Sequence, residues 1–203
     1  MAEITVPDYD ALEIRSLDYA EAAQINRSAW TGTRKAIGLP GATLWRGQIE
    51  VRDIATELDE RPWRGFKAAL RGVDNWFKAY LPCQSHIGPA PTVAAGAGNG
   101  YTLPLTGMTP NTTILWAGQH MTVPLPSGHK RAVRLEADLV TDGSGNATAQ
   151  FSPALNETPT LGASVETARP YVPVTASGPD NPFAHDNGLS AFTMDIEEAI
   201  GGA

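Results

Sequence analysis

The stretch from Asp59 to Pro82, DERPWRGFKAALRGVDNWFKAYLP, decides the fold expected for this chain. Its apolar residues recur at spacings of three and four, which places them on one face of a helix. These residues are Trp63, Phe66, Leu70 and Val73. Strand-like sequence lies on both sides of this stretch, so the sequence predicts one principal helix within a mainly β protein.

Both ends of this helix are predicted from local residues. Asp59 is the expected N-cap, and Pro62 suits the first turn, where its missing N–H costs no hydrogen bond. Gly72 is expected to take the left-handed conformation that ends the helix, so that NWFKAYLP, from Asn75 onward, forms an aromatic-rich strand. The alternative is one longer helix through Tyr80, in which Gly72 would cost about 1 kcal/mol relative to Ala.

Alternating sequence predicts strands in the first third and at the C-terminal end. A short apolar-polar stretch contains Leu12, Ile14 and Leu17. Clearer apolar positions are Trp45, Gly47, Ile49 and Val51, and later Phe192, Met194 and Ile196. Period two with one polar face is typical of a half-buried strand in an antiparallel sheet. The C-terminal strand needs a sheet to join, and the N-terminal sheet is the simplest host.

The middle of the chain differs in composition and is expected to form a separate module. Residues 84–100 are rich in Pro, Gly and Ala, which predicts a crossing or an exposed loop. Strands are then expected at Thr112–Trp116, Met121–Leu125 and Val133–Leu139. The turn Asp142–Asn146 predicts a hairpin into Phe151, a weak stretch follows at 152–160, and a Pro- and Gly-rich loop covers Ser177–Gly188. The predicted division is therefore a first domain of residues 1–84 with 165–203, and an inserted β module of residues 85–164.

Composition excludes some functions. The chain has 203 residues, 42% apolar and 18% charged, with a net charge of −7, which is typical of a globular protein and unfavourable for binding nucleic acid. No apolar run approaches the roughly 20 residues of a membrane span, and the N-terminal residues do not resemble a signal peptide. The single cysteine, Cys83, can form neither an internal disulfide nor a cysteine-based metal site.

We find no pattern that predicts catalysis, a metal or a cofactor. The run Ala94–Gly100 lacks the Lys-Ser/Thr of a phosphate loop, and the turn Asp142–Asn146 lacks the spacing of a calcium loop. The four histidines form no zinc-binding pair. His185 and Asp186 could be half of a triad, but no G-x-S-x-G elbow supplies a nucleophile. The carboxylates Glu57, Asp59 and Glu60 are explained by the start of the helix.

The tryptophans are more informative. Trp45 and Trp63, with Phe66, are expected to pack the helix against the sheet. Trp30 differs, because it lies in RSAWTGTRKAIGLPGATLW, a polar connection before the Trp45 strand. A Trp there either anchors a loop or contacts a neighbouring subunit.

Several short motifs follow one another in a recognisable order. They are Trp30-Thr31-Gly32 with Arg34, Leu44-Trp45-Arg46-Gly47, the segment Trp63–Tyr80 with Leu70-Arg71-Gly72 and Phe77, and VTDGSGNATAQFSP at Val140–Pro153. This order resembles the minor tail proteins of long-tailed bacteriophages, and within them it is most similar to distal tail proteins. The resemblance covers most of the chain, although each motif is short.

The resemblance implies a fold and a set of partners. The first domain would be a tail-tube-like β-barrel or sandwich, and the inserted module would be a small barrel of the oligosaccharide/oligonucleotide-binding or galectin-like type. Six copies would form a ring in the virion tail that joins the tail-tube protein to the tip or baseplate hub proteins, around the channel for DNA. An acidic subunit fits a channel that should not retain DNA. Within this family Trp30, Thr31 and Arg34 are expected at the subunit interface, and the core is expected to contain Trp45, Trp63, Phe66, Leu70, Gly72 and Phe77.

Two other functions stay open from sequence. A carbohydrate-binding module for host attachment would use Trp116 and Tyr101 as stacking faces, with polar partners in the 177–188 loop. A hydrolase with an unrecognised site is disfavoured, because nucleophile, metal cluster and acid-base pair are all missing from the sequence patterns.

Overall fold

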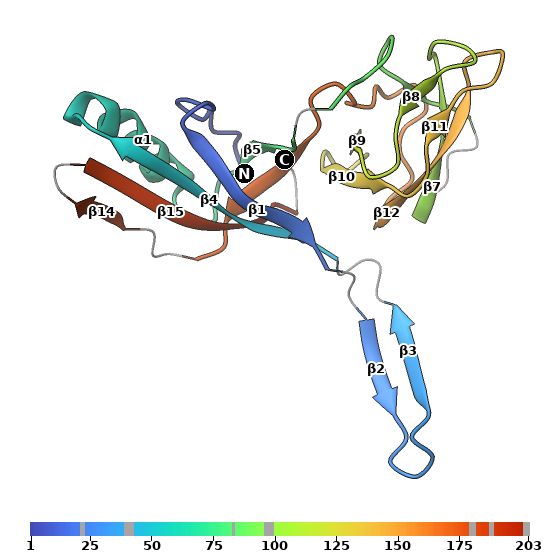
Figure 1. The fold of residues 1–203 in the computed structure, drawn as a ribbon, viewed down its shortest axis with the longest axis horizontal. Helices are drawn as coiled ribbons and strands as arrows, with labels where there is room; N and C mark the ends of the chain where they lie inside the picture. The colour runs from blue at the N-terminus through green and yellow to red at the C-terminus, as the bar shows by residue number, and fades with distance from the viewer. Residues whose placement is uncertain are drawn as a thin grey trace.

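The computed structural model describes residues 1–20, 23–38, 43–82, 84–95, 100–178, 182–186 and 189–200. Within these residues the chain is mainly β with a single helix, α1 (Glu57–Leu70), which confirms the predicted fold class (Figure 1). No described helix has the length and apolar character needed to cross a bilayer. Cys83 lies outside the described residues, as do parts of the Ala94–Gly100 run and of the Ser177–Gly188 loop.

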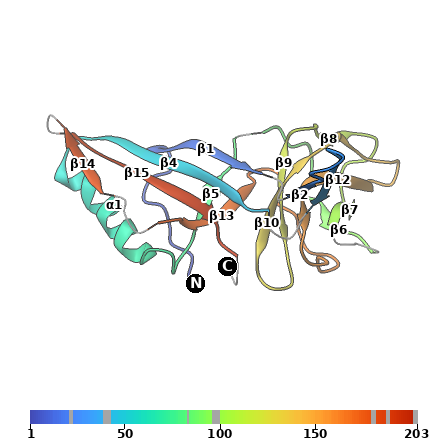
Figure 2. The same ribbon diagram turned by 90° about the horizontal axis from the view of Figure 1, so that it is seen from below.

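The first lobe is a six-stranded antiparallel sheet. Its strands lie in the order β1 (Leu12–Tyr19), β4 (Trp45–Ile54), β15 (Leu189–Glu198), β13 (Tyr171–Ala176) and β5 (Phe77–Tyr80), and β14 (Phe183–Asp186) pairs with β15. The C-terminal strand lies between β4 and β13, with Met194 opposite Ile49. The prediction that this strand joins the N-terminal sheet is therefore confirmed. Figure 2 shows α1 running along one side of this sheet, beneath β14 and β15.

The second lobe is built from the middle of the chain. A five-stranded sheet has the order β6 (Thr92–Val93), β7 (Gly100–Thr106), β12 (Ala147–Leu155), β10 (Lys130–Leu135) and β9 (His120–Pro124). Beside it, β8 (Thr113–Leu115) pairs with β11 (Leu139–Val140). The last pair of strands, β2 (Ala23–Arg27) and β3 (Arg34–Gly38), forms a hairpin that projects away from both lobes (Figure 1).

Buried apolar residues form two clusters. The first draws on residues 6–81 and 172–196 together with Ala132, and the second on residues 93–165. In the first cluster Trp63 of α1 meets Phe192 edge to face, and Phe66 meets Phe77. Apart from Ala132, each cluster comes from one of the two chain portions that differ in composition.

The helix ends differ in detail from the sequence prediction. The N-cap is Thr56, not Asp59: the Thr56 hydroxyl accepts a hydrogen bond from the Asp59 N–H at 3.2 Å and donates one to the Asp59 carboxylate at 2.7 Å. The helix therefore starts earlier, which leaves Pro62 inside it rather than in its first turn. Thr56 lies outside the apolar pattern and gave no periodic signal, but threonine is also among the residues preferred at the N-cap.

The helix does end before Tyr80, as predicted. Arg71 takes the left-handed cap conformation with φ 49°, and Gly72 follows with φ 70°. Gly72 is exposed, so its expected place in the core is wrong: the turn places it on the surface. Val73 is exposed for the same reason, because the chain has already left the helix.

Three other predictions of local structure are wrong. The strand expected at Val133–Leu139 is two strands, β10 and β11, because the chain turns at residues 136–138 and exposes Ala137. The expected loops at 84–100 and Ser177–Gly188 each contain a short strand, β6 and β14. Strands β6 and β14 are short or weakly alternating in sequence. They form because β6 pairs with β7 and β14 pairs with β15.

Candidate functional site

The β2–β3 hairpin, residues 23–38 and called the arm below, carries the three residues predicted for a subunit interface. Trp30 and Thr31 lie in the loop between its strands, and Arg34 begins β3. The Trp30 side chain is 97% exposed. Apart from half-buried Ser28, the side chains described between Gln24 and Thr33 are all exposed. The arm therefore holds a large aromatic ring in solvent at its tip.

Local hydrogen bonds hold the tip loop in a defined shape. The Ser28 hydroxyl accepts from the N–H groups of Trp30 at 3.3 Å and Thr31 at 3.2 Å, and the Ser28 N–H donates to the Thr33 carbonyl at 2.9 Å. Gly32 has φ 66°, a conformation that favours glycine, and donates to the Ser28 carbonyl. An ordered loop of this kind reduces the entropy lost when the exposed Trp binds a partner.

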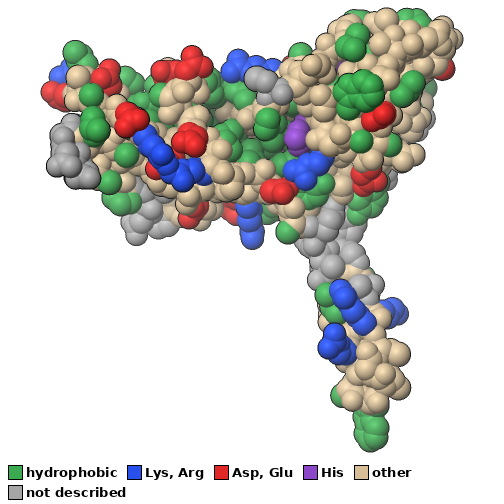
Figure 3. Space-filling model, viewed as in Figure 1, with side chains coloured by type: hydrophobic (Ala, Val, Ile, Leu, Met, Phe, Trp, Pro, Cys, Tyr) green, Lys and Arg blue, Asp and Glu red, His purple; other side chains and the backbone are tan. Residues whose placement is uncertain are grey.

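The arm is also positively charged. Arg27, Arg34 and Lys35 lie on it, and residues 23–38 contain no Asp or Glu, although the whole chain carries −7 (Figure 3). Arg27 lies directly opposite Arg34 in the strand register. Like charges directly opposite each other destabilise a hairpin. The positive charge of the arm is therefore not neutralised by acidic residues within the arm, and this charge suits it to bind an acidic partner surface.

The side chains predicted for the core, apart from Gly72, are buried under the first sheet, but they lie at two different places along it. Trp45, Trp63, Phe66, Leu70 and Phe77 are all buried in the first cluster. Trp45 begins β4, at the end away from α1, and packs against Tyr19 and His120, so the prediction that it packs the helix against the sheet is wrong. Its indole N–H donates to the carbonyl of Ala132 in β10 at 2.8 Å. This bond joins the first sheet to the second lobe.

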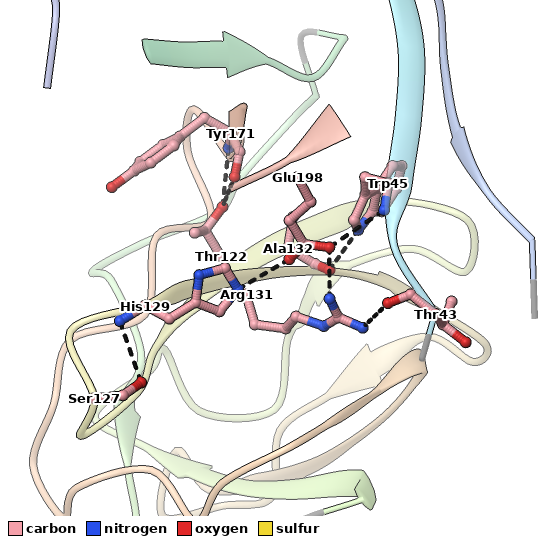
Figure 4. Close-up of polar contacts among 9 residues, drawn as sticks. All are labelled: Thr43, Trp45, Thr122, Ser127, His129, Arg131, Ala132, Tyr171 and Glu198. Atoms are coloured by element: carbon pink, nitrogen blue, oxygen red, sulfur yellow. Dashed lines mark hydrogen bonds and ion pairs between the residues drawn. The ribbon is translucent and has the colours of Figure 1, made fainter. Parts of the chain in front are cut away.

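A buried polar cluster, called the junction below, surrounds that contact (Figure 4). Its central residue is Glu198 at the end of β15, whose carboxylate is fully buried. One carboxylate oxygen lies 3.0 Å from Nε2 of His129, and the other accepts hydrogen bonds from the Arg131 guanidinium and, at 3.2 Å, from the backbone N–H of Trp45. Arg131 also donates to the Thr43 carbonyl at 2.7 Å. These contacts join Glu198 of the first lobe to His129 and Arg131 of the second, and removing one partner of the ion pair would leave a buried charge unpaired.

Two further contacts extend the junction. Thr122 of β9 donates its hydroxyl to the Tyr171 carbonyl at 2.8 Å and accepts from the Tyr171 N–H at 2.9 Å (Figure 4). On the other side, Arg134 reaches Asp18 at 2.8 Å and lies over the Trp45 ring. Burial, and then the positive charge of Arg134, lower the pKa of His120 to about 4, against the opposing effect of Asp18.

The junction is not predicted from the sequence. Arginine usually lies on the surface and histidine is intermediate in burial, yet Arg131 and His129 are both buried. A usable signal was present in β15: Glu198 continues the two-residue period of Met194 and Ile196, so it points inward. A charged residue at an inward position predicts a buried partner.

The histidine-containing loop forms a small polar group whose geometry differs from that of a triad. Nδ1 of His185 lies 2.8 Å from the Ser190 hydroxyl, and that hydroxyl donates to Glu60 at 3.0 Å. Burial opposes ionisation of Glu60, but hydrogen bonds from Ser190 and Arg64 hold the pKa of this carboxyl below its usual value. The carboxylate thus contacts the serine, whereas a triad carboxylate orients the imidazole.

Other candidate positions are ordinary surface or turn residues. In the 142–146 turn, the Asp142 carboxylate accepts from the N–H groups of Asn146 and Ser144, which lowers its pKa. Within the described residues no group of three His, Cys, Asp or Glu side chains is placed to hold a metal ion. Trp116 and Tyr101 are partly exposed, but they come from different sheets, next to β8 and in β7.

Comparison with known proteins gives no relative. No protein-family model matches the chain, and a search of curated proteins gives no match. The features of the chain that bear on its function are therefore the arm, the junction and the residues that carry the resemblance.

Proposed function

We propose that this chain is a structural subunit of a bacteriophage tail tip, forming a ring in the virion that connects the tail tube to the tip or baseplate around the DNA channel. The observation that carries the proposal is the arm. Its preordered loop exposes Trp30 at the end of a basic hairpin, next to Thr31 and Arg34. Tryptophan and arginine are the residues most enriched among energetic hot spots of protein interfaces.

The two-lobed β architecture supports the same proposal. A sheet with one helix along it and the C-terminal strand at its centre, with a second β lobe formed by the intervening residues, fits a tail-tube-like ring domain with an inserted module. In this proposal the chain acts by assembling: copies of it form a homo-oligomeric ring, and the ring binds the tail-tube protein and the hub proteins. No catalysis and no cofactor is involved.

Gene order is the first test. We expect a long, helix-rich reading frame of the kind that sets tail length just upstream of this gene, and further tail-tip genes downstream. A neighbourhood of sugar-metabolism or secreted-enzyme genes would contradict the proposal.

Assembly gives the second test. Full-length protein produced together with its neighbouring tail proteins should form six-fold rings in electron micrographs. Trp30→Ala should reduce ring or tail assembly while leaving the monomer folded, and Leu161→Ala, which removes an exposed apolar side chain from the second lobe, is the matched control. Normal assembly by Trp30→Ala would remove the role of the arm.

A further inference from the structure

The first sheet has a cavity at the end of β4 that is farthest from the arm. Its volume is about 360 Å³, and it lies between residues 7–11, the end of β4 and the first turns of α1. The buried side chains of Val51, Ile54 and Trp63 line it. A cavity of about 150 Å³ is known to bind benzene, so this volume accommodates an indole.

The rim of this cavity combines an exposed apolar side chain with negative charge. Leu58 is 73% exposed at the rim, although it is a large apolar residue. Asp8, Asp53 and Asp59 line the cavity against one basic residue, Arg52, which already pairs with Glu50. The rim is therefore acidic where the arm is basic.

The cavity and the arm lie at opposite ends of the same strand pair. At one end Leu12 of β1 pairs with Val51, next to the cavity, and at the other end Tyr19 pairs with Trp45, next to the arm. The arm continues away from the sheet (Figure 1), and the turn between β2 and β3 that holds Trp30 is at its far end, so Trp30 does not approach the cavity of its own chain. The complementary surfaces of one chain can then meet only between two copies.

We infer that the cavity between α1 and the end of β4 receives the tip of the arm of a second copy of this chain. Trp30 of one copy enters the apolar cavity beside Leu58, and Arg27, Arg34 and Lys35 face Asp8, Asp53 and Asp59. The acidic rim also relieves the repulsion between Arg27 and Arg34. This inference depends on the proposed function, and it specifies which surface receives the arm.

This contact has a direct consequence for assembly. It is heterologous, since each copy offers an arm at one end and a cavity at the other. Heterologous contacts give a closed ring when the rotation per subunit closes, and an open filament when it does not. If the rotation closes, this one contact is enough to build a ring of identical subunits, without any second interface.

Thiol cross-linking of the full chain tests the contact. All proteins carry Cys83→Ser. Ala29→Cys labels the arm beside an intact Trp30, and Arg52→Cys labels the cavity while keeping its apolar lining and its three aspartates. The two single-cysteine proteins are mixed at high concentration with a short bismaleimide. The control replaces Arg52→Cys by Leu161→Cys, an exposed position in the second lobe.

We expect a covalent dimer of the Ala29→Cys and Arg52→Cys proteins, several-fold more abundant than the dimer with Leu161→Cys. Adding Trp30→Ala to the first protein should weaken association by about thirty-fold or more, the effect of losing an interface hot spot. Leu58→Glu in the second protein should act similarly without unfolding it, because Leu58 is exposed.

Three results would overturn the inference: equal coupling to both cysteine positions, no coupling at all, or only intramolecular coupling in a chain carrying Ala29→Cys and Arg52→Cys together. Electron micrographs of the same mixtures separate this failure from failure of the proposed function. Rings without coupling at residue 52 would leave the ring proposal standing and place the arm elsewhere. Coupling without rings would support the contact but argue against the ring.

Discussion

The arm and the junction both present an aromatic residue together with basic side chains, but they do so in opposite surroundings. In the junction, Trp45 and Arg131 are fully buried, and their polar groups bond to Ala132 and Glu198 (Figure 4). In the arm, Trp30, Arg27 and Arg34 are exposed, and the two arginines face each other. The same residue types therefore stabilise the fold in the junction but contribute little to its stability in the arm.

This difference indicates what each region is for. The residues of the junction stabilise the fold of their own chain, because removing any one of them leaves a buried polar group without its hydrogen-bond partner. Residues of the arm have no such explanation, since an exposed Trp contributes little to the stability of its own chain. Substitutions in the two regions should therefore separate folding from assembly.

The largest effect on stability is expected at Glu198. Glu198→Gln leaves the fully buried Arg131 without its counter-charge, so we expect the free energy of unfolding to fall by about 3–5 kcal/mol. The neighbouring Glu197→Gln is the control, because Glu197 pairs with the exposed Arg46 at 3.7 Å and should contribute at most about 1 kcal/mol. Urea denaturation measures both, and equal effects would mean that burial of the junction charges does not matter.

A smaller loss is expected at Trp45. Trp45→Phe removes the indole N–H that reaches the Ala132 carbonyl, and an unpaired buried carbonyl costs about 1–3 kcal/mol. Because this bond joins the two lobes, amide hydrogen exchange should increase around β10 as well as β4. Faster exchange confined to β4 would argue that the bond does not couple the lobes.

Acid should weaken the junction through His120. Its pKa is lowered to about 4 in the folded protein, against an ordinary value of about 6.5 in the unfolded chain. Between these values the unfolded chain binds more protons, so stability falls as the pH drops from about 6.5 towards 4. His120→Gln should flatten this part of the profile relative to the natural protein. An unchanged slope would show that His120 does not contribute to it.

The smallest effect on stability is expected at the arm. Trp30→Ala should change the free energy of unfolding by no more than about 0.5 kcal/mol, because the side chain is almost fully exposed. Trp63→Ala, which removes a buried Trp of α1, should cost about 3–5 kcal/mol. A large loss with Trp30→Ala would mean that Trp30 packs within its own chain, and the comparison between arm and junction would fail.

Much of the fold follows from sequence periodicity. Spacings of three and four predicted the helix around Trp63, Phe66 and Leu70, and period two predicted β4 and the C-terminal strand. These signals are strong because each repeats over several residues and matches one buried face. Short elements were missed, because β6 has two residues and β14 four, and neither repeats a pattern often enough to be recognised.

Some residues of the candidate site could likewise be predicted from sequence, and others could not. The sequence by itself singled out Trp30, because a large apolar residue in a polar connection has no partner in the local pattern. It also determined the one-helix β fold, since periodicity is a local property, and the change in composition predicted two chain portions. Only the tertiary structure placed Glu198 against Arg131 and His129, and put an acidic cavity at the far end of the strands that carry the arm. Those partners lie 67 and 69 residues from Glu198 in the chain, and no local pattern encodes which distant groups a fold brings together.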